Sequence, residues 1–249
     1  MTLLQPNWGA PPAVLHLSES DIHIWRADLN CANAKLQQLY CLLSEDEQMR
    51  AQRFHFERDR LQFVACRGIL RCLLGQYLGL EPAHLRFCYG PQGKPTLESS
   101  ADSVSVVSTV VSTVQFNLSH SQGLALYAIT RQAPIGIDLE YCQLLELDTI
   151  AKSYFSSREY AQLSALPPWE QRTAFFQLWT CKEAYLKATG QGLSGLEDAE
   201  LSFQCNQPIL KTTGTECWQL QSLIPAPRYI AAWAVARQSW AVQFYNLDL

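Results

Sequence analysis

The chain is poor in charged residues and lacks the cysteine spacings of a disulfide framework or a zinc site. Only 17% of its 249 residues are charged, and 19 basic against 23 acidic residues give a net charge of −4. Such a chain has no general attraction for nucleic acid or an anionic membrane, so any anion site must be local. The nine cysteines include no C-x-x-C pair and no histidine at finger spacing, which predicts that all nine are reduced and dispensable for chemistry.

Long apolar runs and a basic N-terminal segment are also missing. No stretch approaches the roughly 18 consecutive apolar residues of a membrane-spanning helix. Residues 1–21 contain two acidic residues and three prolines, which is unlike a secretory signal. We therefore expect a cytoplasmic protein with neither a membrane nor a nucleic-acid partner. Its length and its 48% hydrophobic composition suffice for a real core in one or two domains.

Helix and strand signals occur in both halves of the chain. Apolar spacing and a Ser44 cap predict two helices within residues 44–79, and further helices at about 146–165 and 170–189. Strands are predicted for residues 85–89, for LALYAIT and IGIDLE on either side of a turn at RQAP, and for two runs near the C-terminus. Residues 98–114 are rich in Ser, Val and Thr, and we interpret them as a surface insertion. No internal sequence repeat is strong enough to prove duplication.

Two acidic residues lie side by side in the predicted strand IGIDLE. Because strand side chains alternate, Asp138 and Glu140 share one face, and Ile137 and Leu139 share the other. Paired carboxylates can bind Mg²⁺ and link it to phosphate oxygens. The alternative is that the two acids simply form a solvent-facing side of the strand. Gly136 removes a side chain where a ligand could approach, which is weak support for the first interpretation.

The long predicted helix carries an acid and a base on one stripe. Trp179, Glu183 and Lys187 are spaced at i, i+4 and i+8. An exposed Glu–Lys pair worth a few tenths of a kcal/mol is one explanation. In the other, Glu183 is a further oxygen ligand of the cation and Lys187 faces a phosphate.

Other candidate residues are unremarkable when each is taken alone. Lys94 lies in the turn segment GPQGKP, and His120 lies between two serines in NLSHS. Arg50 and Arg53 lie on the helix that follows Ser44, where basic residues normally face water. Any of them can be an ordinary turn or surface residue.

Together, in their order along the chain, these segments resemble the 4′-phosphopantetheinyl transferases, with the surfactin-synthetase-activating type as the nearest subclass. The blocks are GKP at 93–95, FNLSHS at 116–121, GIDLE at 136–140 and WTCKEAYLK at 179–187. The family signature G-[IV]-D followed by [FW]-[SCT]-x-K-E-[AS]-x-x-K is met at every specified position. The resemblance extends from about Ser44 to Leu193.

The resemblance implies transfer of the 4′-phosphopantetheine arm of coenzyme A to a serine of an apo carrier protein, with release of adenosine 3′,5′-bisphosphate. It implies that Mg²⁺, or Mn²⁺ as an alternative ion, is held by Asp138, Glu140 and Glu183. Asp138, Glu183 and Lys187 form the catalytic set, with Glu183 the candidate proton acceptor and Lys187 also the pyrophosphate contact. The implied contacts to the nucleotide and its 3′-phosphate are Arg50, Lys94, Ser119 and His120.

Two acidic residues need separate comment. Glu47 stands where the surfactin type has a second basic residue. One of the implied basic contacts to the 3′-phosphate is therefore missing at this position, and Arg53 is a candidate substitute for it. Glu159 stands where the family often has a further acid near the site, and it is a weaker candidate for the coenzyme A site.

For the fold, the resemblance implies an α/β (α+β) protein of two similar halves. Each half is a small antiparallel sheet with helices, and the active site lies in the cleft between them. We expect residues 1–131 to supply the nucleotide contacts and residues 134–249 the metal and the catalytic helix, in a monomer with pseudo-twofold halves. The expected partners are coenzyme A and apo carrier proteins of fatty-acid, polyketide or peptide-synthetase type.

Two other functions use similar residues. A Mg²⁺-dependent nucleotide pyrophosphohydrolase also clusters acids, but the chain has no dense Glu-rich helix. A non-catalytic module that binds coenzyme A or a carrier protein would have no need of all three carboxylates.

Overall fold

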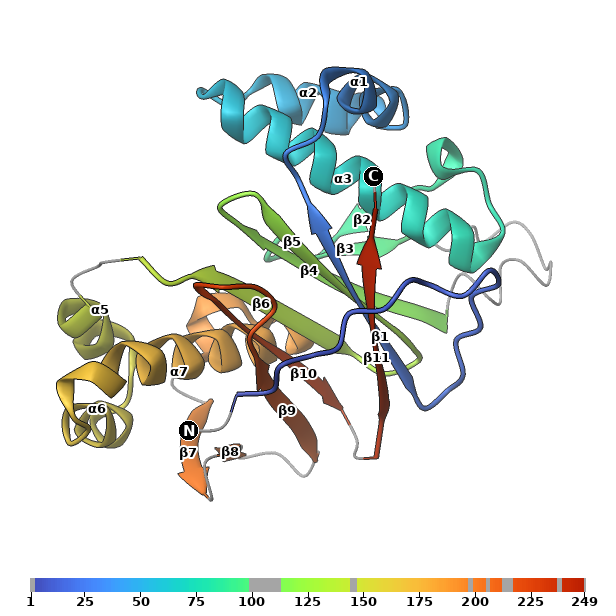
Figure 1. Cartoon of the computed structure of the whole chain (residues 1–249). Helices are drawn as coiled ribbons and strands as arrows, with labels where there is room; N and C mark the ends of the chain where they lie inside the picture. The colour runs from blue at the N-terminus through green and yellow to red at the C-terminus, as the bar shows by residue number, and fades with distance from the viewer. Residues whose placement is uncertain are drawn as a thin grey trace.

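The computed structural model describes residues 3–98, 113–143, 147–196, 199–204, 207–211, 217–236 and 239–248. Two sheets form the centre of the molecule, and a long helix packs on each (Figure 1). One sheet has the strand order β11-β1-β5-β4, and the other has the order β6-β10-β9. Two short hairpins, β2-β3 and β7-β8, complete the strands of this part of the chain.

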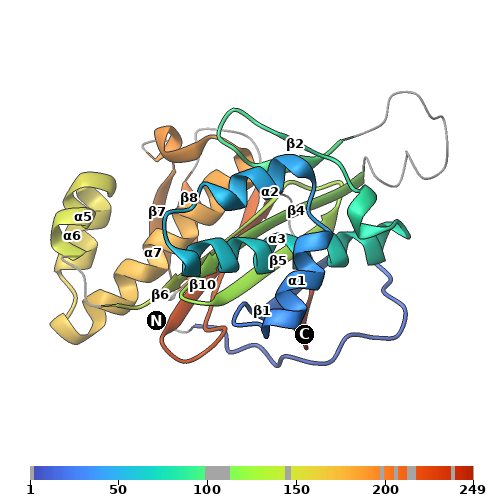
Figure 2. The same cartoon turned by 90° about the horizontal axis from the view of Figure 1, so that it is seen from above.

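The first half begins with strand β1 (Asp21–Asp28) and three helices, α1 (Asn33–Cys41), α2 (Glu45–Gln52) and α3 (Glu57–Leu78). A short 3-10 helix, η1 (Pro82–His84), leads to β2 (Phe87–Tyr89), β3 (Pro95–Leu97), β4 (Val114–Ser121) and β5 (Leu124–Arg131). Seen from above, α1, α2 and α3 lie together on one side of the sheet (Figure 2). The apolar face of α3 closes the core of this half, with Ile69, Leu70 and Leu73 fully buried.

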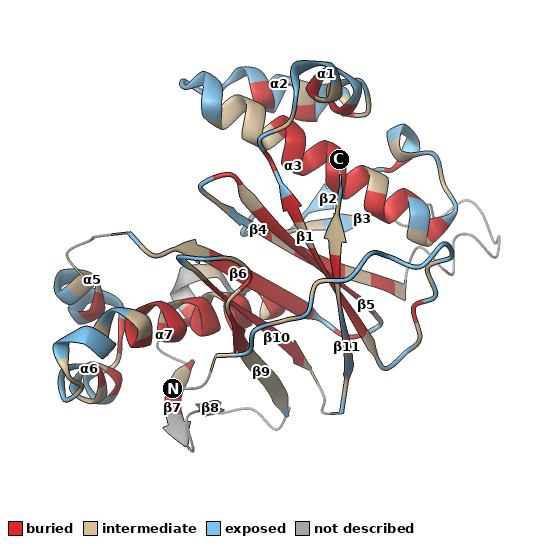
Figure 3. Ribbon diagram, viewed as in Figure 1, coloured by how far each residue is buried: buried red, intermediate tan, exposed pale blue. Residues whose placement is uncertain are grey.

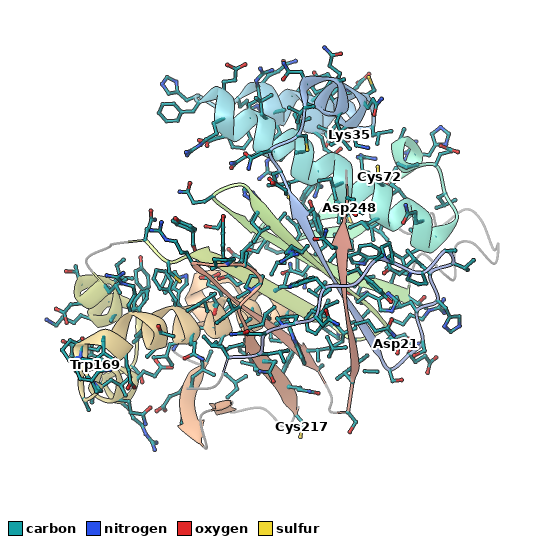
Figure 4. All side chains as sticks on the ribbon, viewed as in Figure 1. Asp21, Lys35, Cys72, Trp169, Cys217 and Asp248 are labelled. Atoms are coloured by element: carbon teal, nitrogen blue, oxygen red, sulfur yellow. The ribbon has the colours of Figure 1, made fainter. Side chains whose placement is uncertain are left out.

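The second half begins with strand β6 (Ile135–Tyr141) and helices α5 (Leu147–Tyr154), α6 (Ser157–Ser164) and α7 (Pro168–Thr189). It continues through the 3-10 helix η2 (Gly192–Gly195) to β7 (Glu200–Gln204), β8 (Gln207–Lys211), β9 (Trp218–Leu223) and β10 (Tyr229–Ala236). Buried residues follow the strands and the inner face of α7 (Figure 3). Trp169, at the start of α7, lies at the outer end of this helical group (Figure 4).

The two halves repeat one order of elements. A strand, two short helices and a 22-residue helix are followed by a 3-10 turn, a short hairpin and two long strands. The sheet orders β1-β5-β4 and β6-β10-β9 are also equivalent. Both long helices end at a left-handed glycine, Gly79 and Gly190, where the missing side chain permits a positive φ. The predicted architecture of two similar halves is confirmed.

A buried ion pair recurs at equivalent places in the two halves. Ser44 and Ser156 cap α2 and α6 in capping boxes whose N3 residues are Glu47 and Glu159. Each glutamate is buried against a base on the long helix that follows: Glu47 Oε2 accepts from Arg71 Nε at 2.6 Å, and Glu159 accepts from Lys182 Nζ at 2.8 Å. Both bases are the fifteenth residue of their helix. This repeat was not recognised in the sequence, because the paired residues differ in type and spacing.

The C-terminal strand crosses back to the first half. β11 (Ala241–Leu247) pairs in parallel with β1, from Asp21↔Ala241 to Ala27↔Leu247. The first sheet is therefore not wholly antiparallel, because its outer edge is covered by a strand from the far end of the chain. A domain boundary at residues 131–134 separates the two repeats along the chain. It does not separate the two sheets, because β11 follows the boundary in sequence and pairs with β1 in the first sheet.

Gly136 serves the contact between α7 and β6. A Cβ at this position would lie 1.9 Å from the Ala184 carbonyl oxygen and 2.5 Å from the Ala188 nitrogen. The interpretation that Gly136 makes room for a ligand is therefore wrong, because the backbone of α7 fills that space. The absence of a side chain lets α7 lie directly on β6, next to Asp138.

The predicted elements agree with the structure at most positions. Two helices follow Ser44, two more cover residues 147–164, and α7 begins two residues before the predicted start. The sequence interpretation did not include β1 and α1. Most of the Ser/Val/Thr segment, residues 99–112, lies outside the described residues. The eight cysteines that the structure describes are free, and no described helix has the length and hydropathy needed to cross a bilayer.

Candidate functional site

A cleft of about 440 Å³ opens between the two halves. The first half contributes Arg50, Lys94 and His120, and the second contributes Glu183 and Lys187 from α7. Five of the residues predicted from the sequence thus line one cavity, although they come from segments as distant as α2 and α7. Its apolar walls include Phe63, Cys66, Leu118 and Leu186.

Asp138 is the buried acid beside this cleft. Its side chain is 5% exposed, and its Oδ1 accepts from Lys187 Nζ at 2.5 Å and from Ser119 Oγ at 3.0 Å. Lys187 Nζ also donates to Ser119 Oγ at 3.1 Å. The other carboxylate oxygen, Oδ2, is buried and has no hydrogen-bond partner. The interpretation of Asp138 as a solvent-facing strand residue is therefore wrong, and so is that of Lys187 as the surface partner of Glu183.

Glu140 and Glu183 share the electrostatic environment of Asp138. Burial, followed by the charge of Asp138, raises the pKa of the Glu140 carboxyl to about 7. The same two causes raise the pKa of Glu183. Lys187 opposes both shifts. Three carboxylates thus interact with the one cation Lys187 beside the cleft, a charge distribution that a further cation would balance.

Lys94 reaches from the β2-β3 turn across to the second half. Its Nζ donates to the carbonyl oxygens of Ile135 on β6 and Ala188 on α7, both at 3.2 Å. Burial lowers the pKa of this ammonium to about 8. An ammonium has three N–H donors, so one remains for a ligand in the cleft.

Arg50 and His120 lie in the cleft without an ion-pair partner among the described residues. The Arg50 guanidinium carbon is 5.5 Å from the centre of the Phe63 ring. Desolvation in the cleft and then the charge of Lys187 lower the pKa of His120. Arg53 lines a neighbouring surface hollow that shares Arg50 and Tyr89 with the cleft. Arg50 thus lines both hollows, whereas Arg53 lines only the neighbouring one.

Glu47 is a structural residue in this chain. It is 1% exposed and holds Arg67 and Arg71 through its two carboxylate oxygens, each at 2.6 Å. The Arg67 side chain also lines the cleft and donates to Tyr89 Oη at 2.5 Å. Arg67 on α3 thus adds a further cation to the wall of the cleft, whereas Glu47 on α2 is buried.

Glu159 is not brought to the cleft. It is 0% exposed, and beyond Lys182 its carboxylate accepts from the backbone N–H groups of Ser156 and Leu201. The Glu159 side chain thus links α6, α7 and β7 through hydrogen bonds.

The sequence interpretation missed Asn117 and Arg67 as residues of the site. Asn117 lies in the quoted FNLSHS block, and its alternation with Ser119 and Ser121 was the available signal. Arg67 lies within an apolar helix, where an arginine is seldom buried without a partner. That the partner is Glu47 could not be known without the fold.

Comparison with known proteins shows similarity to a single family. A family model for the 4′-phosphopantetheinyl transferase superfamily matches residues 134–236, and one for the N-terminal part of a 4′-phosphopantetheinyl transferase matches residues 27–132. The chain is 42% identical over 245 residues to 4′-phosphopantetheinyl transferase HetI of Nostoc sp., covering 98% of this chain and 100% of that one.

Two more distant similarities cover only part of the chain. The chain is 31% identical over 152 residues to 4′-phosphopantetheinyl transferase Sfp of Bacillus subtilis, covering 61% of this chain and 62% of that one. A solved holo-(acyl-carrier-protein) synthase from Bacillus anthracis in complex with CoA (3′,5′-ADP) is 25% identical, covers 41% of this chain and 94% of its own, and has a TM-score of 0.33. The near-complete match to HetI, together with the two family models, shows that the chain belongs to the 4′-phosphopantetheinyl transferase family.

Proposed function

We propose that this transferase moves the 4′-phosphopantetheine arm of coenzyme A to a serine of an apo carrier protein and releases adenosine 3′,5′-bisphosphate. The observation that supports this most directly is the electrostatic coupling of three acids with Lys187 beside a cleft that is also lined by Arg50, Lys94 and His120. Transfer of a phosphoryl group requires positive charge placed around the phosphate oxygens more than it requires covalent chemistry.

Asp138, Glu140 and Glu183 are the residues that would hold Mg²⁺, with Mn²⁺ as an alternative ion. They fit a hard divalent cation, because all their ligand atoms are oxygens and the buried Asp138 Oδ2 has no other partner. No three such side chains among the described residues are yet close enough to hold a metal. Lys187 instead balances Asp138. When bound, the cation would neutralise charge on the pyrophosphate and favour ionisation of an oxygen ligand.

Arg50, Lys94, Ser119 and His120 are the proposed contacts to the nucleotide part of coenzyme A, with Arg53 at the outer edge. Arg50 and His120 carry no competing ion pair in the described structure, so their hydrogen-bond donors are available for the 3′-phosphate. Lys187, which lies in the cleft and pairs with Asp138, is the proposed contact to the pyrophosphate. Charge-assisted hydrogen bonds to phosphate are the strong class, which suits an anionic co-substrate.

Glu183 is the proposed acceptor of the serine proton, directly or through a water. Its side chain lines the cleft, and burial together with Asp138 raises its pKa toward the range useful for a general base. Glu183 lies one helical turn before Lys187, so the residue that takes the proton and the residue that contacts the phosphate are held on one rigid helix.

The two halves have separate tasks in this proposal. Residues 1–131 supply the nucleotide contacts, and residues 134–249 supply the metal ligands and the catalytic helix. The protein acts as a monomer in the cytoplasm, on carriers of fatty-acid, polyketide or peptide-synthetase type.

The test is mass spectrometry of several purified apo carrier proteins incubated with coenzyme A and Mg²⁺. Wild type should add the phosphopantetheine mass, and Asp138→Ala should not at ordinary Mg²⁺ concentrations. Asp148→Ala is a matched control, since Asp148 is exposed on α5. Full activity of Asp138→Ala would refute the metal assignment, and cleavage of coenzyme A without a carrier would indicate a pyrophosphohydrolase instead.

A further inference from the structure

The edge of β6 that faces the first half is filled by side chains. Asn117 Oδ1 accepts from the Ile137 backbone N–H at 2.8 Å, and Ser121 Oγ accepts from the Tyr141 N–H at 3.2 Å. Both side chains come from β4, whose hydrogen-bonded neighbour in its own sheet is β5. At the start of β6, the Ile135 carbonyl accepts from Lys94. Side chains of the first half thus contact this edge of β6 at its start, middle and end.

This arrangement differs from that of the equivalent strand in the first half. There, the outer edge of β1 pairs backbone to backbone with β11. Between β4 and β6 the Asn117 and Ser121 side chains serve as acceptors in place of backbone carbonyls, so the strands need not approach to the roughly 4.8 Å spacing of paired strands. A buried backbone N–H left without an acceptor is costly, which makes these two contacts a specific requirement of the local register.

The same side of β4 contacts the acidic residues themselves. Between Asn117 and Ser121 on the alternating pattern of β4, Ser119 donates to Asp138. The Ser121 hydroxyl, which accepts from Tyr141, lies 3.4 Å from Glu140 Oε2 and can donate to it. Each of the proposed metal ligands on β6 thus has a β4 hydroxyl beside it and a β4-bound backbone N–H next to it in sequence.

We propose that Asn117 and Ser121 are positioning residues that hold β6 in register with β4, and thereby fix Asp138 and Glu140 relative to the nucleotide side of the cleft. Neither residue needs to touch a reacting atom for this. The inference rests on the proposed function in taking Asp138 and Glu140 as metal ligands. Hydrogen-bond partners of metal ligands commonly govern metal affinity by about 10- to 100-fold.

The first test is a titration of the protein with Mn²⁺ in the presence of coenzyme A. The electron paramagnetic resonance signal of the free ion measures how much Mn²⁺ remains unbound. Ser121→Ala should weaken Mn²⁺ binding about tenfold, at the low end of that range because its contact to Glu140 is long. Ser121→Thr keeps the hydroxyl and should restore binding. Coenzyme A affinity measured without metal should change less than about twofold in both variants.

Asn117 gives an independent second test. Asn117→Leu removes the acceptor for the Ile137 N–H, and Asn117→Asp keeps it. We expect Asn117→Leu to bind Mn²⁺ more weakly than wild type does, and Asn117→Asp to bind it more tightly than Asn117→Leu does. Thr130→Val is the matched control, because Thr130 on β5 is a buried residue whose hydroxyl donates to the Ala133 carbonyl in the turn before β6 and makes no hydrogen bond to β6 itself. It should lower stability without changing Mn²⁺ binding.

The outcomes separate this inference from the proposed function. If wild type binds Mn²⁺ no better than Asp138→Ala, the metal assignment itself fails. If wild type binds Mn²⁺ and Ser121→Ala binds it equally well, the positioning role is wrong. A loss of Mn²⁺ affinity in Thr130→Val equal to that in Ser121→Ala would show a general effect of lowered stability and would also overturn the inference.

Discussion

Lys187 on α7 and Asp138 on β6, 49 positions apart in the sequence, form an ion pair with Nζ 2.5 Å from Oδ1. The lysine is 29% exposed in its side chain and the aspartate only 5%, so the pair lies at the boundary between the core and the cleft. This ion pair therefore joins α7 directly to β6. A ligand that attracts either partner must compete with the other.

The cations at the nucleotide end should recognise the 3′-phosphate. We expect Arg50→Ala and His120→Ala each to weaken coenzyme A binding by about 1–3 kcal/mol, because each removes a charged or polar donor to phosphate. Titration calorimetry with coenzyme A and with dephospho-coenzyme A measures this. The losses should shrink with the ligand that lacks the phosphate. Arg58→Ala is the control, since Arg58 is 70% exposed beside Asp59, and equal losses with both ligands would contradict the placement.

Glu47 should matter for stability. Glu47→Ala leaves two buried arginines without their shared carboxylate, and breaking a buried ion pair typically costs about 3–5 kcal/mol. Urea unfolding measures the change in the free energy of unfolding. Glu45→Ala, two residues earlier on the same helix and exposed, should change it by less than about 1 kcal/mol. If Glu47→Ala is as mild as Glu45→Ala, the arginines do not depend on this acid.

The sequence predicted which residues lie in or beside the cleft better than it predicted the contacts that those residues make. Asp138, Glu183 and Lys187 were found because the residue types and their spacing resemble one family signature. The pairing of Lys187 with Asp138 rather than Glu183 was not predicted, because it depends on how closely α7 approaches β6. That approach is set by Gly136, whose packing role becomes visible only when the backbone of α7 is in place.

The acids that form capping boxes show a second limit of the sequence. Glu47 and Glu159 each stand three residues after a serine, a local pattern that indicates a helix start. Their burial against Arg71 and Lys182 depends on long-range packing, which local spacing does not reveal. Similarly, β11 pairs with β1 across the whole length of the chain, so a boundary drawn along the sequence could not anticipate it.

Gly136→Ala should displace the catalytic helix. The added methyl group would meet the Ala184 carbonyl far inside contact distance, so α7 must move or the variant must lose stability, by about 1–3 kcal/mol or more. We expect a lower thermal midpoint and loss of transfer activity together. Gly90→Ala is the control, because the nearest atom to its Cβ would be 3.8 Å away. A normal thermal midpoint with full activity in Gly136→Ala would show that α7 does not need this close approach.

His23 should make the fold sensitive to acid. It is buried, its Nδ1 is 2.6 Å from Tyr77 Oη, and burial lowers its pKa from 6.5 to about 4, with Asp21 opposing and His16 adding to the shift. Between pH 6.5 and about pH 4, the His23 imidazole is protonated in the unfolded chain and neutral in the folded protein. Stability therefore falls as the pH drops below 6.5, by at most about 1.4 kcal/mol per pH unit from this residue.

Urea unfolding of wild type and His23→Asn between pH 7 and pH 4.5 tests this dependence. The asparagine oxygen can replace Nδ1 as an acceptor but does not titrate. The stability advantage of wild type at pH 7 should shrink as the pH falls. An advantage that stays constant over this range would show that His23 is not the titrating group.

The role of Glu183 is the central claim, and carrier modification by Glu183→Gln tests it most directly. The glutamine keeps the side-chain shape and removes both the negative charge and the base. General-base catalysis is typically worth about 10²- to 10⁴-fold, so the rate of carrier mass gain should fall at least that far. Glu170→Gln, on the exposed first turn of the same helix, should react like wild type. Binding of the apo carrier should be unchanged in both, and near-normal carrier modification by Glu183→Gln would contradict the account.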